Sequence, residues 1–195
     1  MFSPEERHWR LAGELATMKI STDAFCAGLG MRPADMPALA SSLLRCGAQN
    51  RDARLVEFGL FVGHSFAFLR DDLDVLERLA GEDWHISHEN IVAALSAMRS
   101  PSSIDALYGM ALARYAYRDY DEAFSLAVAC IWALGGIESA ASIERLRQLL
   151  SSDSEIVADN AARQLVRARD EWFSSVLREA AGLAVDGYTM RSPED

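Results

Sequence analysis

The sequence predicts an all-α protein of stacked antiparallel helical hairpins, an α-solenoid with about nine or ten helices. Three observations lead to this prediction. Apolar residues recur every three or four positions along most of the chain, which is typical of amphipathic helices. No segment alternates apolar and polar residues between hairpin turns, as paired strands would. Two helical hairpins also repeat in the second half of the chain, and such a repeat indicates a stacked array.

Residues 1–70 are expected to form helices without a clean repeat. The run SPEE at residues 3–6 has the form of a capping box with proline at the first helical position, so a helix is expected to begin there. The segment GLGMRP at residues 28–33 breaks the chain, and Pro37 is expected to begin another helix. The stretch Arg54–Leu69 is apolar on nearly every side, which predicts a buried helix.

Residues 71–168 are expected to form regular hairpins, and residues 169–195 a C-terminal helix and tail, within one domain covering residues 1–195. Trp132 lies in the middle of the apolar run ACIWAL, so we expect it to be largely buried between hairpins. The helices expected within the hairpins cover residues 71–80, 87–98, 104–115, 122–134, 141–150 and 155–168.

The hairpin repeat places an insertion at one loop. Ile104 matches Ile143 at an offset of 39 residues, whereas Glu122 matches Glu155 at an offset of 33, so the first hairpin has six extra residues between its helices. The insertion is the segment YAYRDYDE, Tyr115–Glu122. In stacked repeats such insertions form loops on one face, which is often the binding face.

The net charge of −10 is concentrated in the middle of the chain. Residues 71–122 have eleven acids and four bases, a net of −7, whereas residues 1–70 have a net of +1 and residues 123–195 a net of −4. An acidic protein is a poor ligand for nucleic-acid phosphates, so we expect no nucleic-acid partner. A local acidic field instead attracts basic proteins.

The segment Ala133–Leu165 resembles a HEAT repeat, because it follows the pattern ALGxIxSxxSIxxLxxLL and then SDxEIxxxAAxxL. The wider stretch from Trp84 to Leu165, with DWHISHENI, SIDALY, YAYRDYDEAFSLAV and CIWALGGI, resembles HEAT-type immunity proteins of bacterial polymorphic toxin systems. This resemblance implies a HEAT/armadillo-like solenoid that binds and neutralises a cognate toxin in the cytoplasm, as a 1:1 complex. It does not identify the toxin or decide between occlusion of its active site and allosteric inhibition.

The predicted partner-binding surface combines the insertion with the segment DWHISHE. Tyrosine gives a large contact area with few rotatable bonds, and flanking acids favour a basic partner such as a nuclease domain. At least one tyrosine of the insertion is expected to pack inward instead. The predicted partner-binding residues are Asp83, Trp84, His85, His88, Glu89, Tyr115, Tyr117, Arg118, Asp119, Tyr120, Asp121 and Glu122.

Other chemistry is weakly supported, so we expect no enzyme, metal or cofactor. His85 and His88 are spaced i and i+3, whereas zinc proteases use i and i+4. His64 and Ser65 are adjacent, and neighbours on a helix point about 100° apart. Acids on an exposed loop, such as Asp119, suit binding better than acid–base catalysis. A HEAT-like DNA glycosylase would need a basic groove.

Location and function class follow from the remaining features. The three cysteines form no CxxC pair and lie in apolar runs, which suggests a reducing compartment. The longest uncharged apolar run, Ala123–Ile137, has 15 residues, fewer than the roughly 20 that span a bilayer. No signal peptide is apparent, and a cytoplasmic protein without a membrane partner is expected. The alternative function is a general HEAT-repeat scaffold or adaptor without a toxin partner.

Overall fold

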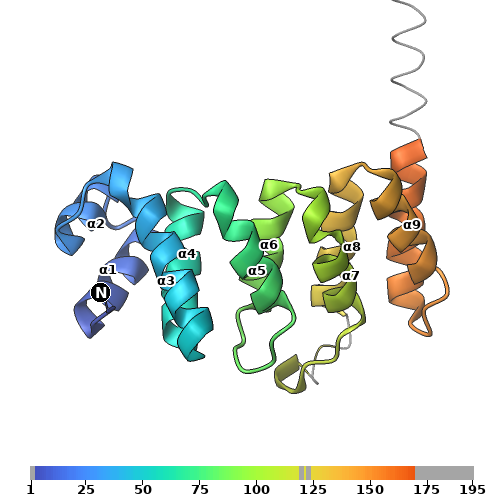
Figure 1. The fold of residues 1–195 in the computed structure, drawn as a ribbon, viewed down its shortest axis with the longest axis horizontal. Helices are drawn as coiled ribbons and strands as arrows, with labels where there is room; N and C mark the ends of the chain where they lie inside the picture. Colours follow the sequence, from blue (N-terminus) through green and yellow to red (C-terminus); the bar gives the residue numbers. More distant parts are fainter. Residues whose placement is uncertain (1–2, 119–120, 122–123, 170–195) are drawn as a thin grey trace, which may run out of the picture.

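The computed structural model describes residues 3–118, 121 and 124–169. Within these residues all regular secondary structure is helical, and there is no strand. Antiparallel helical hairpins stack side by side along the molecule (Figure 1). The predicted all-α architecture is therefore confirmed. The helix expected from residue 169 onward lies outside the described residues, apart from Arg169 itself. The elements are α1 (Glu6–Ala16), α2 (Thr22–Leu29), η1 (Pro33–Asp35), α3 (Met36–Asn50), α4 (Ala53–Ser65), η2 (Arg70–Asp72), α5 (Leu73–Ala80), α6 (His88–Met98), η3 (Pro101–Ser103), α7 (Ile104–Leu112), η4 (Ala116–Arg118), α8 (Ser125–Ile137), α9 (Ala140–Leu149) and a further helix over residues 155–169.

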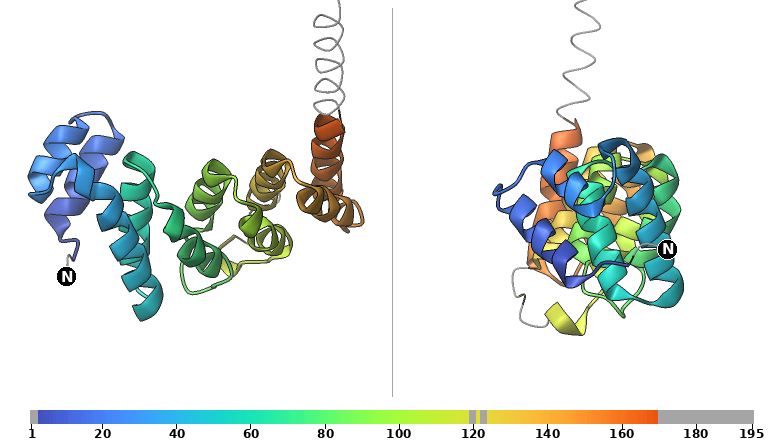
Figure 2. Two further views of the ribbon diagram at one scale, coloured as in Figure 1. Left: turned by 45° about the horizontal axis from the view of Figure 1, so that its top comes forward. Right: turned by 90° about the vertical axis from the view of Figure 1, so that its left-hand side faces the viewer.

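The hairpins form two layers of helices. Helices α3, α5, α7 and α9 contact one another in chain order and form one layer, and α4, α6 and α8 form the other. Figure 2 shows the stack from the side and along its length. Because consecutive hairpins repeat the same packing, the loops between α3 and α4, α5 and α6, and α7 and α8 lie along one edge of the molecule (Figure 1). This edge is the lower edge in Figure 1, and we call it the loop edge.

Helices α3 and α4 form a closely packed hairpin within the region where no clean repeat was expected. The Asp52 carboxylate accepts hydrogen bonds from the amides of Arg54 and Leu55 and so caps α4. A Cβ atom at Gly59 would lie 3.1 Å from the Leu43 side chain. The two helices can approach this closely because Gly59 has no side chain.

Several helix boundaries differ from the predictions. The largest shifts in the hairpins are at α7, which ends at residue 112 and not 115, and at α8, which covers residues 125–137 and not 122–134. Helix α1 begins at Glu6 instead of Ser3, because His8 Nδ1 accepts the Glu5 amide hydrogen at 2.9 Å and completes the N-terminal cap. The helix expected to reach Leu69 ends at Ser65, and Leu69 is exposed. Residues 66–69 instead lead to a cap, in which the Asp72 carboxylate accepts the Leu69 amide hydrogen.

The prediction that Trp132 is largely buried is wrong, because its side chain is 50% exposed. Helix α8 has no charged residue in its 13 positions, so its sequence does not distinguish the buried face from the exposed face. The neighbouring Cys130 and Ile131 are fully buried. Trp132 lies on the other face, where its indole N–H donates to Asn160 Oδ1 at 3.4 Å.

The predicted insertion is present between α7 and α8. Helices α7 and α8 begin 21 residues apart, at 104 and 125, whereas α9 and the next helix begin 15 residues apart, at 140 and 155. The difference is the six extra residues found by matching the repeats. Among the described residues, no helix is long and apolar enough to cross a membrane.

Candidate protein-binding edge

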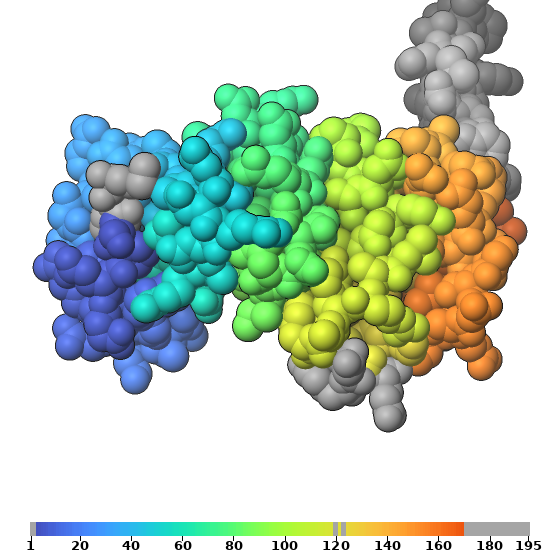
Figure 3. All heavy atoms as spheres, turned by 60° about the horizontal axis from the view of Figure 1, so that its bottom comes forward, coloured from blue at the N-terminus to red at the C-terminus, as the bar shows by residue number. Residues whose placement is uncertain are grey.

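Two neighbouring loops of the loop edge form the candidate site. Residues 81–87 connect α5 to α6, and residues 113–124, which contain the insertion, connect α7 to α8. Figure 3 shows this edge of the molecule, with the described parts of the two loops beside each other. The stacking of the hairpins therefore brings together the two sequence segments from which we predicted a binding surface.

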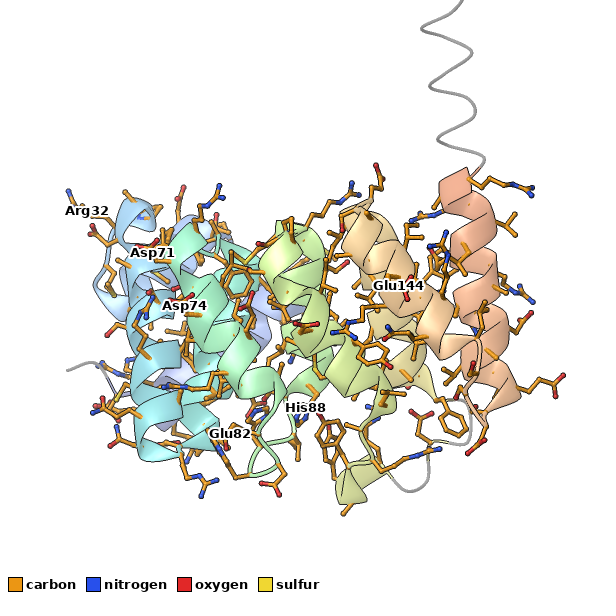
Figure 4. All side chains as sticks on the ribbon, turned by 45° about the vertical axis from the view of Figure 1, so that its right-hand side comes forward. Arg32, Asp71, Asp74, Glu82, His88 and Glu144 are labelled. Atoms are coloured by element: carbon orange, nitrogen blue, oxygen red, sulfur yellow. The ribbon has the colours of Figure 1, made fainter. Side chains whose placement is uncertain are left out.

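Two histidines hold the first loop from inside. His85 and His88 are 1% and 0% exposed, and their rings stack with centroids 4.5 Å apart. His85 Nε2 lies 2.9 Å from the carbonyl oxygen of Leu79, and His88 Nε2 lies 2.8 Å from that of Glu82. A carbonyl oxygen only accepts, so each Nε2 has the hydrogen. Figure 4 shows His88 and Glu82 at this end of the hairpins.

The second loop is attached to the first through two tyrosines. Burial lowers the pKa of His88 to about 4, so its ring is neutral and its Nδ1 can only accept. The Tyr117 hydroxyl lies 2.9 Å from this Nδ1 and therefore donates to it. The Tyr115 hydroxyl donates to the carbonyl oxygen of Ala80 at 3.1 Å, and burial raises the pKa of Tyr115 to about 12. Both tyrosines thus use their hydroxyl groups within the protein.

The aromatic rings stack across the boundary between the loops. The His88 ring centroid lies 3.8 Å from that of Tyr115 and 5.8 Å from that of Tyr117. Tyr115 also packs against the hydrophobic core, as expected for at least one tyrosine of the insertion. Hydrogen bonds and ring contacts therefore hold the two loops together.

Arg118 makes the third connection. Its guanidinium group lies 2.7 Å from the Glu89 carboxylate and 2.6 Å from that of Asp121, and it also contacts the Ser125 hydroxyl. Asp121 accepts the Ser125 amide hydrogen at 2.9 Å and so caps the start of α8. The hydrogen bond from Arg118, and then those from Ser125, hold the pKa of Asp121 below its usual range. Arg118 and Asp121 thus have a structural role within the loop.

The outer surface of the first loop combines an apolar side chain with acids. Ile86 is 71% exposed, between the buried residues His85 and Ser87. Asp83 and Glu89 are exposed on either side of it. We did not predict Ile86, because the sequence does not show that its neighbours His85 and Ser87 point inward and so leave Ile86 between them pointing outward.

Trp84 and Glu82 link this loop to the preceding hairpin. The Trp84 indole N–H donates to Glu82 Oε2 at 2.7 Å, and Arg51 makes a 3.2 Å ion pair with the same carboxylate. The hydrogen bonds from Arg51 and then Trp84 lower the pKa of Glu82. Trp84 is half-buried against the core, so only part of its ring is available to a partner.

The predicted surface residues that the structure describes therefore separate into three groups by their exposure. Asp83 and Glu89 are exposed, and Trp84, Tyr115, Tyr117, Arg118 and Asp121 are partly buried. His85 and His88 were expected to contribute exposed side chains, but both side chains are buried. Their Nε2–H groups donate hydrogen bonds to carbonyl oxygens near the end of α5. Asp119, Tyr120 and Glu122 lie outside the described residues.

A pocket of about 390 Å³ lies beside the second loop. Its walls include Arg114, Tyr115 and Phe124 on one side and the turn at residues 151–154 on the other. The Arg114 guanidinium lies 4.2 Å from the Phe124 ring centroid. A side chain from a partner that contacts the loop edge could enter this pocket.

The described residues show no arrangement for metal binding or nucleophilic catalysis. They contain no group of three or more histidine, cysteine, aspartate or glutamate side chains that could hold a metal ion. His64 Nε2 donates to the Asn90 carbonyl oxygen, and the Ser65 hydroxyl donates to that of Phe61, so this pair does not interact.

The stacked hairpins and the loop edge define the class of this protein, a helical-repeat protein with a HEAT-like fold. A comparison with protein families agrees with this class: the family described as PBS lyase HEAT-like repeat matches residues 126–152, which cover most of α8, all of α9 and the turn that follows. No curated protein and no solved structure matches the chain significantly.

Proposed function

We propose that this protein is an immunity-type binding module that neutralises a cognate toxin in the cytoplasm, and that it binds the toxin through the loop edge. One observation carries the proposal: the inserted loop is held against its neighbour by the hydrogen bond between Tyr117 and His88 and by the ion pair between Arg118 and Glu89. A loop that only connected two helices could be six residues shorter. An ordered loop also loses less conformational entropy when a partner binds.

The charge of the loop edge favours a basic partner, such as a nuclease domain. Its described acids are Asp52, Glu82, Asp83, Glu89 and Asp121, and its described bases are Arg51, Arg114 and Arg118. Five negative charges against three positive leave a net of −2. Exposed acids steer a basic protein toward the edge, and Ile86 offers an apolar contact between them.

The HEAT-like repeat alone supports the broader function, a scaffold for protein–protein interaction. HEAT-like folds are typically non-catalytic, and the hydrogen bonds of His85 and His88 leave neither ring as a free base. The resemblance of residues 84–165 to HEAT-type immunity proteins supports the more specific function. The two functions differ in one testable respect, which is protection of the cell from a toxin.

The test is co-expression of the tagged chain with the protein encoded beside it. We expect a 1:1 complex on light scattering after affinity purification, and growth of cells that the neighbouring protein alone would kill. Ile86→Ala should weaken both, whereas Glu144→Gln, on the α9 face labelled in Figure 4, should weaken neither. A complex without protection would refute the immunity function in favour of the scaffold. The absence of any complex with a folded chain would refute both.

A further inference from the structure

A second pocket, which no residue of the loop edge lines, has the features of a separate binding site. Its volume is about 580 Å³, and it lies among helices α1, α4 and α6. A volume of this size is typical of small-molecule sites. The lining residues are Trp9, Ala12, Gly13, Ala16, Glu57, Phe61, His64, Ser65, Asn90 and Ala93.

The pocket exists because large and small side chains alternate around it. The Trp9 ring packs edge-on against Phe58, with centroids 5.0 Å apart, and Phe61 lies near Phe58 in turn. The other lining residues of α1, namely Ala12, Gly13 and Ala16, are small, as is Ala93 of α6. A Cβ atom at Gly13 would meet no other atom within 4 Å, so the space beside it is open. The walls are thus largely apolar and held by aromatic packing.

One carboxylate lies at the open side of this pocket. Glu57 is exposed and is the only acid among the lining residues, and it makes no ion pair within the part of the chain that the structure describes. No arginine or lysine lines the pocket, although the Arg54 guanidinium lies over the ring of the lining residue Trp9, 5.6 Å from its centroid. Aromatic rings and a carboxylate together favour a positively charged ligand.

We infer that this pocket binds an apolar group that carries an ammonium or guanidinium ion, with the apolar part beside Gly13 and the cation near Glu57. The chemistry is shared by free aryl-alkyl amines and by a protein segment in which an aromatic residue neighbours a lysine or arginine. The inference is independent of the proposed function, because no residue of the loop edge lines the pocket.

The test is a titration of the ¹⁵N-labelled full chain observed through its tryptophan indole N–H signals. The probes are phenethylammonium, the neutral 2-phenylethanol and the anionic 3-phenylpropionate, which have similar shapes and different charges. We expect the Trp9 signal to shift saturably, with a Kd for phenethylammonium about two- to fivefold lower than that for 2-phenylethanol, as for an exposed ion pair. Glu57→Gln should remove this preference, and Glu155→Gln should retain it.

A second variant tests the location. Gly13→Leu should fill the open space and abolish the Trp9 shift, and leucine favours a helix more than glycine does, so α1 should still form. Gly109→Leu is the matched control, because a Cβ atom at Gly109 in α7 also meets no atom within 4 Å. It should leave the titration unchanged.

A blocked Phe-Lys dipeptide distinguishes the two sources of the ligand. Tighter binding of the dipeptide than of phenethylammonium assigns the site to a protein segment, and weaker binding assigns it to a free small molecule; both results support the inferred chemistry. The inference is overturned if no probe shifts Trp9 saturably, if the cation preference survives Glu57→Gln, or if Gly13→Leu still binds.

Discussion

Replacing Tyr117 with phenylalanine would remove a single oxygen atom from the connection between the two loops. The Tyr117 hydroxyl donates to His88 Nδ1 at 2.9 Å, and His88 is fully buried. Without the hydroxyl, this nitrogen is left as a buried acceptor, which typically costs about 1–3 kcal/mol. Tyr117 itself is only partly buried, so water can reach its side of the bond and the lower half of this range, about 1–2 kcal/mol, is expected.

Thermal unfolding followed by circular dichroism can detect this loss. For a chain of this size, 1 kcal/mol corresponds to a change in Tm of about 2–4 °C, so Tyr117→Phe should melt roughly 2–8 °C lower. Tyr108→Phe is the matched control. Arg145 lies over the Tyr108 ring at 4.8 Å, and the Tyr108 hydroxyl makes no hydrogen bond within the described residues, so this variant should melt like the wild type.

Partner binding should change with stability in Tyr117→Phe. A loop that is no longer held by His88 must be ordered during association, and this cost weakens the complex. If Tyr117→Phe melts within 1 °C of Tyr108→Phe, the hydrogen bond does not hold the loop. If it melts lower but binds the partner with unchanged affinity, the held loop is not the contact surface, and the reasoning that connects loop order to recognition is refuted.

Three further predictions use other parts of the molecule. Asp83→Asn should lower the association rate constant with the partner in surface plasmon resonance without changing Tm. The difference from the wild type should shrink at high salt, since exposed charges are screened beyond about 8 Å at physiological ionic strength. A difference that does not depend on salt would contradict electrostatic steering. Trp132→Ala should lower the free energy of unfolding by about 2 kcal/mol in urea denaturation. This loss is smaller than the roughly 3–5 kcal/mol typical of a buried tryptophan, because half of the Trp132 side chain is already exposed. A loss above about 4 kcal/mol would show that the Trp132 side chain is buried. His88 has an ordinary pKa of 6.5 that falls to about 4 in the folded chain, so the unfolded chain binds the proton first as pH falls, and stability is lost from about pH 6.5 down to about pH 4. His88→Gln should therefore lose roughly 3 kcal/mol less than the wild type between pH 7 and pH 4 in urea denaturation, and parallel pH profiles would show that His88 does not titrate in this range.

The repeat architecture was predictable from local sequence patterns. The match of Ile104 with Ile143 and of Glu122 with Glu155 depends only on the spacing of apolar and capping residues, and this spacing repeats because each hairpin packs against its neighbour in the same way. The exposed face of α8 was not predictable by the same means. A helix without charged residues has apolar side chains on all sides, so only tertiary packing reveals that Trp132 faces outward.

The two segments of the loop edge were predictable, but the roles of their residues were not. Histidines in a polar loop are usually exposed, and nothing in the sequence shows that His85 and His88 donate to the carbonyl groups of Leu79 and Glu82. These bonds depend on how the chain leaves α5, because the last turn of the helix and the residues after it present the carbonyl oxygens of Leu79 and Glu82 to the two rings. With both histidines directed inward, Ile86 between them points outward. The failure to predict Ile86 and the wrong prediction that His85 and His88 are exposed therefore have the same cause.

This division of roles allows the stability of the loop edge to be tested separately from the proposed recognition there. His88, Tyr115 and Tyr117 use their polar groups within the protein, so changes to them alter the fold and, through it, the binding surface. Asp83 and Ile86 make no comparable internal bond and are exposed, so changes to them can alter binding alone. A variant set drawn from both groups therefore tests whether the partner contacts the outer side chains or depends only on the shape that the inner ones maintain. If the loop edge is the interface, variants of Asp83 and Ile86 must bind the partner more weakly while their Tm stays unchanged, because these exposed side chains do not hold the fold together.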